Sequence, residues 1–170
     1  NKVLKLKPSK FDLGAVAAQI ARLMQPLADQ KKITLMAEHL PKVTIHADEQ
    51  KIRQLVLILV DNALKYTPEG GQVKVEFRKA EKGRICLAVA DTGIGISKED
   101  QEKVFDRFYR VDKARSREMG GNGLGLAIAQ EIVNLHQGTI AIDSDLGKGT
   151  TFLITLKTKV KGKTKPLNML

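Results

Sequence analysis

The sequence of 170 residues predicts a two-layer α/β sandwich, in which three main helices pack on one face of a mixed sheet. Three observations support this fold class. Three stretches repeat apolar residues with helical spacing, six shorter stretches have the composition of strands, and strands do not alternate strictly with helices. Because strict alternation is typical of a doubly wound parallel sheet, its absence favours the two-layer arrangement.

The N-terminal part of the chain predicts one helix followed by two short strands. The helix is expected to begin behind Asp12, a candidate N-cap, and to run to about Lys31. Its apolar residues recur in steps of three and four: Leu13, Val16, Ile20, Leu23 and Leu27. The strands are expected at 33–37 and 43–47.

A second helix and a hairpin are expected next. The helix begins near Asp48 and ends before Pro68, where a Glu-Gly-Gly turn follows. Its apolar face comprises Ile52, Leu55, Val56, Leu59 and Ala63. Residues 72–78 alternate apolar and polar side chains, whereas 84–90 are nearly all apolar, so these segments predict a hairpin whose second strand is buried.

The C-terminal half predicts a long loop between a short helix and a third main helix. Residues 97–100 have a capping-box pattern that opens the short helix. From about 105 to 121 no periodicity is sustained, and a loop of this length in a compact domain is usually functional, often as a lid. The third helix is expected to end near His136, and residues 139–156 to close the sheet as a hairpin.

Composition excludes several classes of protein. With 42% hydrophobic and 28% charged residues, the chain has the composition of a soluble globular domain. Its longest apolar run, 55–60, is far shorter than the ~20 residues of a membrane span. The single cysteine, Cys86, lies in an apolar strand and is expected to be a small buried residue. Because no start methionine or signal peptide opens the chain, residue 1 is expected to be a cut inside a longer protein.

The formal charge of +10 lies mostly at the two ends. Lysines at 2, 5, 7 and 10, and five more between 157 and 165, nearly account for the excess. Aromatic residues, which stack on bases in nucleic-acid-binding surfaces, make up only 4% of the chain, so no nucleic-acid partner is expected. A second cluster, between Lys103 and Arg117, has six basic residues against two acidic ones and falls in the predicted loop.

The segment Asp91-x-Gly93-x-Gly95 places a carboxylate at the end of a buried strand. Such a carboxylate accepts a hydrogen bond from the exocyclic amine of adenine and repels the carbonyl oxygen that guanine has at that position. Glycines directly after it let backbone approach a ligand closely. The same pattern also fits a tight turn capped by the Asp91 side chain, and the motif alone does not decide between the two.

Two further glycine segments flank the third helix. Gly121 to Gly125 precede it, where free backbone N–H groups and the positive end of the helix dipole favour phosphate. The segment is not a P-loop, because no Gly-x-x-x-x-Gly-Lys-Ser/Thr occurs in the chain. Gly147 to Phe152 is most simply the turn of the last hairpin.

The end of the second helix presents three functional groups on one face. Asn62, Lys65 and Tyr66 stand at i, i+3 and i+4 and therefore project together. An amide oxygen suits Mg²⁺, an ammonium group neutralises phosphate, and an aromatic ring packs on a base. Taken alone, the same residues also fit an ordinary exposed helix end beside a core tyrosine.

These elements together, in this order, resemble the catalytic ATP-binding domain of bacterial sensor histidine kinases. The similar segments are 61–67 (Asp-Asn-Ala-Leu-Lys-Tyr-Thr) for the N box, 91–96 for the first glycine box, 105–110 (Phe-Asp-Arg-Phe-Tyr-Arg) for the F box, 121–128 for the second glycine box and 144–152 for the closing hairpin. The resemblance covers residues 11 to 156. It implies a Bergerat-type ATP-binding fold with a mobile lid at about 97–121.

The resemblance also implies a reaction: ATP is held with Mg²⁺, and the γ-phosphoryl group passes to a histidine of a separate domain. By position it implies Asn62 for Mg²⁺, Lys65 for phosphate, Tyr66 for the adenine ring, Asp91 for the adenine amine, and Thr150 for the adenine side. The implied backbone lining is Gly93, Gly95, Gly121, Asn122, Gly123, Leu124 and Gly125. Arg107 and Arg110 are implied as the residues that contact the γ-phosphate, where positioning and charge neutralisation dominate catalysis.

Two features depart from the family pattern. Ile58 stands four residues before Asn62, where the family usually has a polar residue and the related gyrase-type ATPases have a water-activating glutamate. Because isoleucine cannot deprotonate water, rapid ATP hydrolysis is disfavoured, and a catalytically weak ATP-binding regulatory module is the alternative hypothesis. The three histidines, His39, His46 and His136, all lack the sequence context of a phosphoacceptor, so the acceptor is expected outside this chain.

The expected organisation has three parts: a basic linker from a missing dimerisation domain at 1–10, the catalytic domain at 11–157 and a basic tail at 158–170. The expected partners are the histidine-bearing dimerisation domain of the same protein and the receiver domain of a response regulator. The isolated domain is expected to be monomeric, and to be the cytoplasmic part of a membrane-bound sensor.

Overall fold

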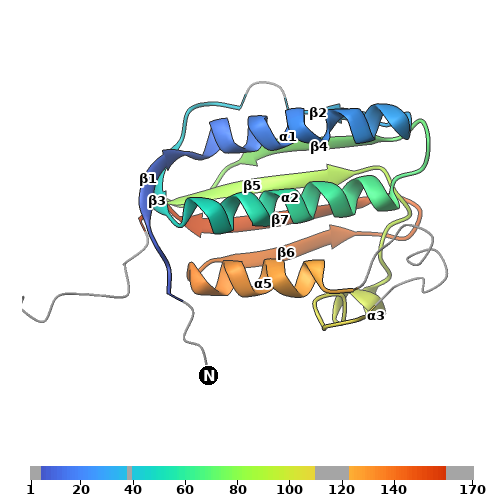
Figure 1. Cartoon of the computed structure of the whole chain (residues 1–170). Helices are drawn as coiled ribbons and strands as arrows, with labels where there is room; N and C mark the ends of the chain where they lie inside the picture. The colour runs from blue at the N-terminus through green and yellow to red at the C-terminus, as the bar shows by residue number, and fades with distance from the viewer. Residues whose placement is uncertain (1–4, 38–39, 110–122, 160–170) are drawn as a thin grey trace, which may run out of the picture.

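The computed structural model describes residues 5–37, 40–109 and 123–159. A five-stranded sheet carries three helices on one face, so the two-layer α/β sandwich is confirmed (Figure 1). The helices are α1 (Leu13–Gln30), α2 (Glu49–Tyr66) and α5 (Gly125–Leu135). The strand order is β2 (Thr34–Met36), β4 (Gln72–Arg78), β5 (Arg84–Asp91), β7 (Thr150–Lys157) and β6 (Thr139–Ser144).

The sheet is mixed, as the sequence predicts. Strands β2 and β4 pair in parallel, and the other neighbours pair antiparallel. The register of β5 with β7 sets Asp91 opposite Thr150, which brings two predicted site residues to one end of the central strands.

A second, two-stranded sheet joins β1 (Ser9–Asp12) to β3 (Thr44–Ala47) at the end of the molecule where α1 and α2 begin (Figure 1). The strand at 43–47 was predicted, but β1 was not. Asp12 connects the two elements, because its Oδ1 accepts from Gly14 N (2.9 Å), which caps α1, and from Val43 N (3.0 Å). The bond from Val43 holds the pKa of Asp12 below its usual value.

The core lies between the sheet and the helices, and it is formed by the apolar faces of the helices together with inward-facing residues of the strands. In β7 the buried positions are Thr150, Phe152, Ile154 and Leu156. Among the described residues, the largest fully buried side chains also include Leu55 and Leu59 of α2 and Leu87 of β5. Cys86 is buried, as expected from its apolar strand. No helix in the described ranges is long and apolar enough to span a membrane.

Side chains also cap two further helices, and of these caps only the one at Ser97 was predicted from the sequence. Asp48 caps α2 by accepting from Lys51 N (3.2 Å), and Ser97 caps the short helix α3 (Lys98–Gln101) by accepting from Asp100 N (3.1 Å). The predicted loop after α3 is described only to residue 109, where it forms turns. The rest of the predicted lid, together with Arg110, Gly121 and Asn122, lies outside the described residues.

Candidate functional site

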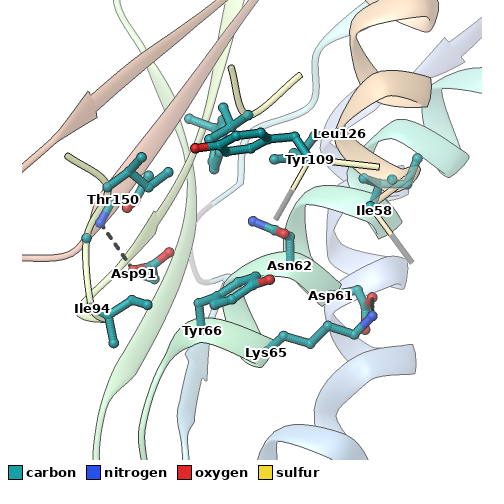
Figure 2. A pocket seen from close by; sticks show the side chains of 16 residues that line it. Ile58, Asp61, Asn62, Lys65, Tyr66, Asp91, Ile94, Tyr109, Leu126 and Thr150 are labelled. Carbon is teal, nitrogen blue, oxygen red and sulfur yellow. Dashed lines mark hydrogen bonds and ion pairs between the residues drawn. The ribbon is translucent and has the colours of Figure 1, made fainter. Parts of the chain in front are cut away.

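A pocket opens at the end of the sandwich where α2 ends and α5 begins (Figure 2). Its walls come from α2, the end of β5 and the loop after it, the start of α5, and β7. The predicted site residues that line it are Asn62, Lys65, Tyr66, Asp91, Gly95, Gly123, Gly125 and Thr150. Predicted site residues as far apart in the sequence as Asn62 and Thr150 therefore line one cavity.

Asp91 is the half-buried carboxylate at the end of β5. Its Oδ1 accepts from Gly93 N (2.8 Å) and from Thr150 N (3.2 Å). Among the described residues, Oδ2 receives no hydrogen bond, so it remains available to a ligand. Burial raises the pKa of Asp91, and the two N–H groups oppose that rise. The carboxylate is thus oriented by the protein but not fully solvated.

The loop after Asp91 requires glycine for close packing. At Gly93, a Cβ atom would lie 2.3 Å from the carbonyl oxygen of Tyr66. The same carbonyl accepts from Ile94 N (3.3 Å), so the loop is held against the end of α2. Gly95 has a φ of 75° and packs in the same way against Asp145. The first glycine segment therefore fixes the distance between Asp91 and the functional groups of α2.

Two side chains form hydrogen bonds with carbonyl groups in the last turn of α2. The Thr67 hydroxyl donates to the carbonyl of Ala63 (2.7 Å), and the Lys31 ammonium donates to the carbonyl of Leu64. These bonds satisfy carbonyl groups that a helix end leaves without intrahelical partners. The turn that bears Asn62, Lys65 and Tyr66 is consequently held at both sides.

Lys65 forms an ion pair within the pocket. Its Nζ lies 3.0 Å from Oδ2 of Asp61, one helical turn earlier, and both side chains are about one-third exposed. Figure 2 shows the pair at the pocket wall below Asn62. Sequence reasoning did not single out Asp61, although the i, i+4 spacing of a carboxylate and a lysine was visible. A phosphate group that binds Lys65 must compete with Asp61.

The second glycine segment forms the opposite wall. Gly123 has a φ of 76°, and its carbonyl accepts from Phe108 N (2.9 Å), which joins it to the F box. Helix α5 begins at Gly125 without a side-chain cap. Because Gly125 and Leu126 line the pocket, the positive end of the α5 dipole is directed to it. Leu124 is the N-cap residue and does not line the pocket.

Several lining residues carry no polar chemistry and were not singled out from the sequence. They are Ile94, Ile96, Val104, Leu126 and Phe152. Tyr109 lines the pocket too, and its hydroxyl donates to Asp100, which raises the pKa of the phenol. Ile58 also lines the pocket and lies close to Gly125: a Cβ atom at Gly125 would be 3.4 Å from Cγ2 of Ile58.

Gly93 and Arg107 are the predicted residues, besides Leu124, that are described but do not line the pocket. Gly93 acts through its contact with Tyr66, as shown above. Arg107 has a largely exposed side chain and lies 3.9 Å from Glu131 of α5. The expected contact of Arg107 with a γ-phosphate is therefore not preformed in this structure.

The sequence matches one family model over residues 47–160, that of the histidine kinase-, DNA gyrase B- and HSP90-like ATPases. Among curated relatives, the sensor histidine kinase WalK of Bacillus subtilis is 47% identical over 172 residues, which cover 94% of this chain and 28% of the relative. The histidine-protein kinase ArlS of Staphylococcus aureus is 54% identical over 104 residues, which cover 61% and 23%. The chain thus spans about a quarter of the length of these relatives.

Solved structures show the same fold. Full-length ShkA in complex with AMPPNP matches with a TM-score of 0.78 and 30% identity, over 95% of this chain and 33% of that one. The catalytic domain of the histidine kinase ThkA matches with a TM-score of 0.76 and 23% identity, over 91% and 99%. The second similarity supports the fold alone.

Proposed function

Because the chain belongs to the family of histidine kinase-, DNA gyrase B- and HSP90-like ATPases, we propose that it is the catalytic domain of a sensor histidine kinase. It binds Mg-ATP and transfers the γ-phosphoryl group to a histidine on a separate dimerisation domain of the same protein. The bond between the γ-phosphorus and the β–γ bridging oxygen breaks, a bond to an imidazole nitrogen forms, and ADP leaves. A receiver domain of a response regulator is the proposed next acceptor, and a membrane-bound sensor the proposed context.

The main observation behind the proposal is the carboxylate of Asp91, in which only one of the two oxygens receives hydrogen bonds from the described residues. Its Oδ1 accepts from two backbone N–H groups, and Asp91 and Tyr66 both line the pocket. An exocyclic amine of adenine would complete the hydrogen bonds of the carboxylate, while the ring packs on Tyr66 and the apolar lining. A carbonyl at the same position would be repelled.

The phosphate groups are proposed to lie between α2 and the start of α5. Lys65 would neutralise phosphate charge after leaving Asp61, and the backbone of Gly123 and Gly125, which line the pocket, would bind phosphate oxygens at the positive helix end. Gly121, Asn122 and Arg110 are proposed to contribute from beyond the described residues. Arg107 would have to exchange Glu131 for the γ-phosphate.

The residues in the pocket fit a Mg²⁺ ion that is held mainly by the nucleotide. No cluster of three or more His, Cys, Asp or Glu side chains that could hold a metal occurs in the described part of the chain. Mg²⁺ commonly keeps several waters and binds one or two protein oxygens together with phosphates. Asn62 lines the pocket, and its amide oxygen suits that role. When bound, the ion neutralises charge that develops on the phosphates.

Ile58 favours one alternative, a regulatory module that binds ATP with little catalysis. Its side chain lines the pocket and packs near Gly125, so an apolar group occupies the place of a water-activating residue. The same contact agrees with a kinase that transfers phosphate to a histidine and hydrolyses ATP slowly.

The two functions are separated by phosphoryl transfer. The domain is incubated with γ-labelled ATP and the separately expressed dimerisation domain of the same protein, with and without Mg²⁺. We expect acid-labile, base-stable label on the acceptor histidine only with Mg²⁺, and strong loss of label with Asn62→Ala. ATP binding without any labelled histidine would support the regulatory module, and absence of ATP binding would contradict both.

A further inference from the structure

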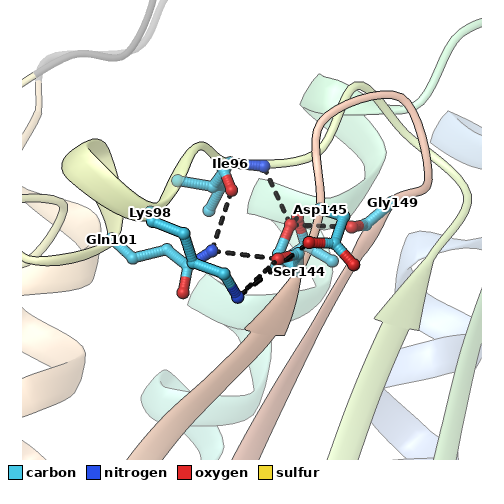
Figure 3. Close-up of polar contacts among 7 residues, drawn as sticks. Ile96, Lys98, Gln101, Ser144, Asp145 and Gly149 are labelled. Carbon is cyan, nitrogen blue, oxygen red and sulfur yellow. Dashed lines mark hydrogen bonds and ion pairs between the residues drawn. The ribbon is translucent and has the colours of Figure 1, made fainter.

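Ser144, the last residue of β6, has a buried hydroxyl that contacts two residues of the pocket lining, Ile96 and Thr150. It is only 4% exposed, and its contacts join three segments (Figure 3). The hydroxyl oxygen accepts from Ile96 N (2.8 Å), donates to the carbonyl of Gly149 (2.7 Å) and lies 2.9 Å from Oγ1 of Thr150. The carbonyl of Ser144 accepts from the side-chain amide of Gln101 (3.0 Å), which fixes the residue from outside.

The direction of the bond between the two hydroxyl groups follows from counting protons. A serine hydroxyl has one proton to donate and two lone pairs that accept. The Gly149 carbonyl has no proton, so the 2.7 Å contact uses the proton of Ser144. Ile96 N–H takes one lone pair of the serine oxygen. The 2.9 Å contact is therefore made by the proton of Thr150, which points to Ser144.

This arrangement decides what Thr150 offers to a ligand. Thr150 lines the pocket, and its only hydroxyl proton is directed away to Ser144. Only lone pairs remain on its oxygen, to which no other donor of the described residues is bonded. The neighbouring Oδ2 of Asp91 is also an acceptor. Two acceptors side by side match a group that donates, and they repel a carbonyl oxygen.

We infer that Ser144 is a specificity-determining positioning residue, which keeps Thr150 an acceptor and so favours a purine with an exocyclic amine over one with a carbonyl. The inference rests on the proposed function and extends it. Ser144 does not touch the ligand. Without its oxygen, the Thr150 hydroxyl is free to rotate and donate into the pocket, where it would stabilise a carbonyl.

The test compares ATP with inosine triphosphate, which differs at this position by a carbonyl in place of the amine. Dissociation constants of both are measured by titration calorimetry for the wild-type chain and for Ser144→Ala. We expect the preference for ATP to fall about five- to tenfold in Ser144→Ala, the size of one hydrogen bond. Ser144→Thr, which keeps a hydroxyl, should restore it. Ser97→Ala, a matched removal of a hydroxyl that caps α3, should leave the preference unchanged.

If Ser144 had only a structural role, Ser144→Ala would weaken the binding of both nucleotides equally, and that result would overturn the inference. So would an unchanged preference in Ser144→Ala. If Ser144→Ala shows no cooperative thermal melt, Thr150→Val tests the same step, because it removes the acceptor, and an unchanged preference there would also overturn the inference. A wild-type chain that binds ATP and inosine triphosphate equally contradicts the specificity alone, whereas one that binds neither contradicts the proposed function.

Discussion

The buried carboxylate of Asp91 is expected to lower the stability of the nucleotide-free protein and to increase its affinity for ATP. Burial raises its pKa, so the folded chain holds the proton more tightly than the unfolded chain, and charging Asp91 at neutral pH destabilises the fold. We predict that, without nucleotide at pH 7, Asp91→Asn melts at a higher temperature than the wild type.

The same substitution should weaken ATP binding by about 1–3 kcal/mol, because the charged acceptor is lost. Calorimetric melts and titrations measure both, and an unchanged affinity would show that Asp91 does not bind the base.

The pH dependence of binding follows from the same residue. An amine that donates to Oδ2 favours the carboxylate, so the pKa of Asp91 falls when the nucleotide binds. Affinity should therefore rise with pH up to the pKa of the empty site and then stay constant. In Asp91→Asn this rise should be absent. Titrations from pH 4.5 to 8 test the prediction, and an equal slope in both chains would contradict it.

The ion pair of Lys65 with Asp61 predicts a gain of affinity from removing an acidic residue. Partly exposed pairs contribute at most about 1 kcal/mol, and phosphate must displace this one. We expect Asp61→Asn to bind ATP about two- to fivefold more tightly at low salt. Adenosine, which lacks phosphate, serves as the control and should bind unchanged. Asp61→Asn combined with Lys65→Gln should show no gain; a gain without Lys65 would mean that Asp61 repels phosphate directly.

At the scale of elements, His136 joins the end of α5 to the start of α2. Its Nε2 accepts from Asp48 N (3.2 Å), so Nδ1 carries the proton and donates to Ile132 O (2.8 Å). The ring is fully buried, and burial lowers the pKa of His136 below 6.5, although the hydrogen bond to Ile132 and the charge of Asp48 oppose this shift. The unfolded chain thus binds the proton more readily. Stability should be complete above about pH 6.5 and fall as the pH decreases below it.

Urea unfolding between pH 5 and 7.5 measures this dependence. His136→Gln keeps an acceptor for Asp48 N but cannot be protonated, so its stability should vary less over this range. The matched control is His46→Gln, because the side chain of His46 is partly exposed. If the wild type and His136→Gln lose stability in parallel, the histidine is not the cause.

Elements whose signals are local were predictable from the sequence. Asp12 and Ser97 are caps that act within a few residues, and the hairpin of β4 and β5 follows from alternation and a turn. Strand β1 was missed because its partner lies more than thirty residues away and none of its own residues is fully buried. The three expected helices and their packing on one face of the sheet were confirmed. Leu23, expected on the apolar face of α1, is instead 65% exposed, and Met24 is buried beside it.

The site was predictable to a smaller extent. The spacing of Asn62, Lys65 and Tyr66 placed them on one face, but the pairing of Lys65 with Asp61 depends on side-chain geometry. The contact of Asp91 with Thr150, 59 residues apart, follows from strand register; the family resemblance assigned both residues to the adenine but did not predict this contact. Arg107 was expected at the phosphates and lies near Glu131, because a surface arginine pairs with whichever carboxylate is close.

At the scale of the molecule, the pocket joins elements that the sequence keeps apart, namely α2, the end of β5, the start of α5, and β7. A ligand that binds all four stabilises only the chain in which all are folded together. At a concentration 100 times its dissociation constant, such a ligand adds about 2.7 kcal/mol. For a domain of this size we expect ATP with Mg²⁺ to raise the melting temperature by about 5 to 10 °C. Guanosine triphosphate at equal concentration should raise it much less, and Asp91→Asn should remove most of the difference. An equal shift for both nucleotides would mean that the phosphates alone connect α2 to α5.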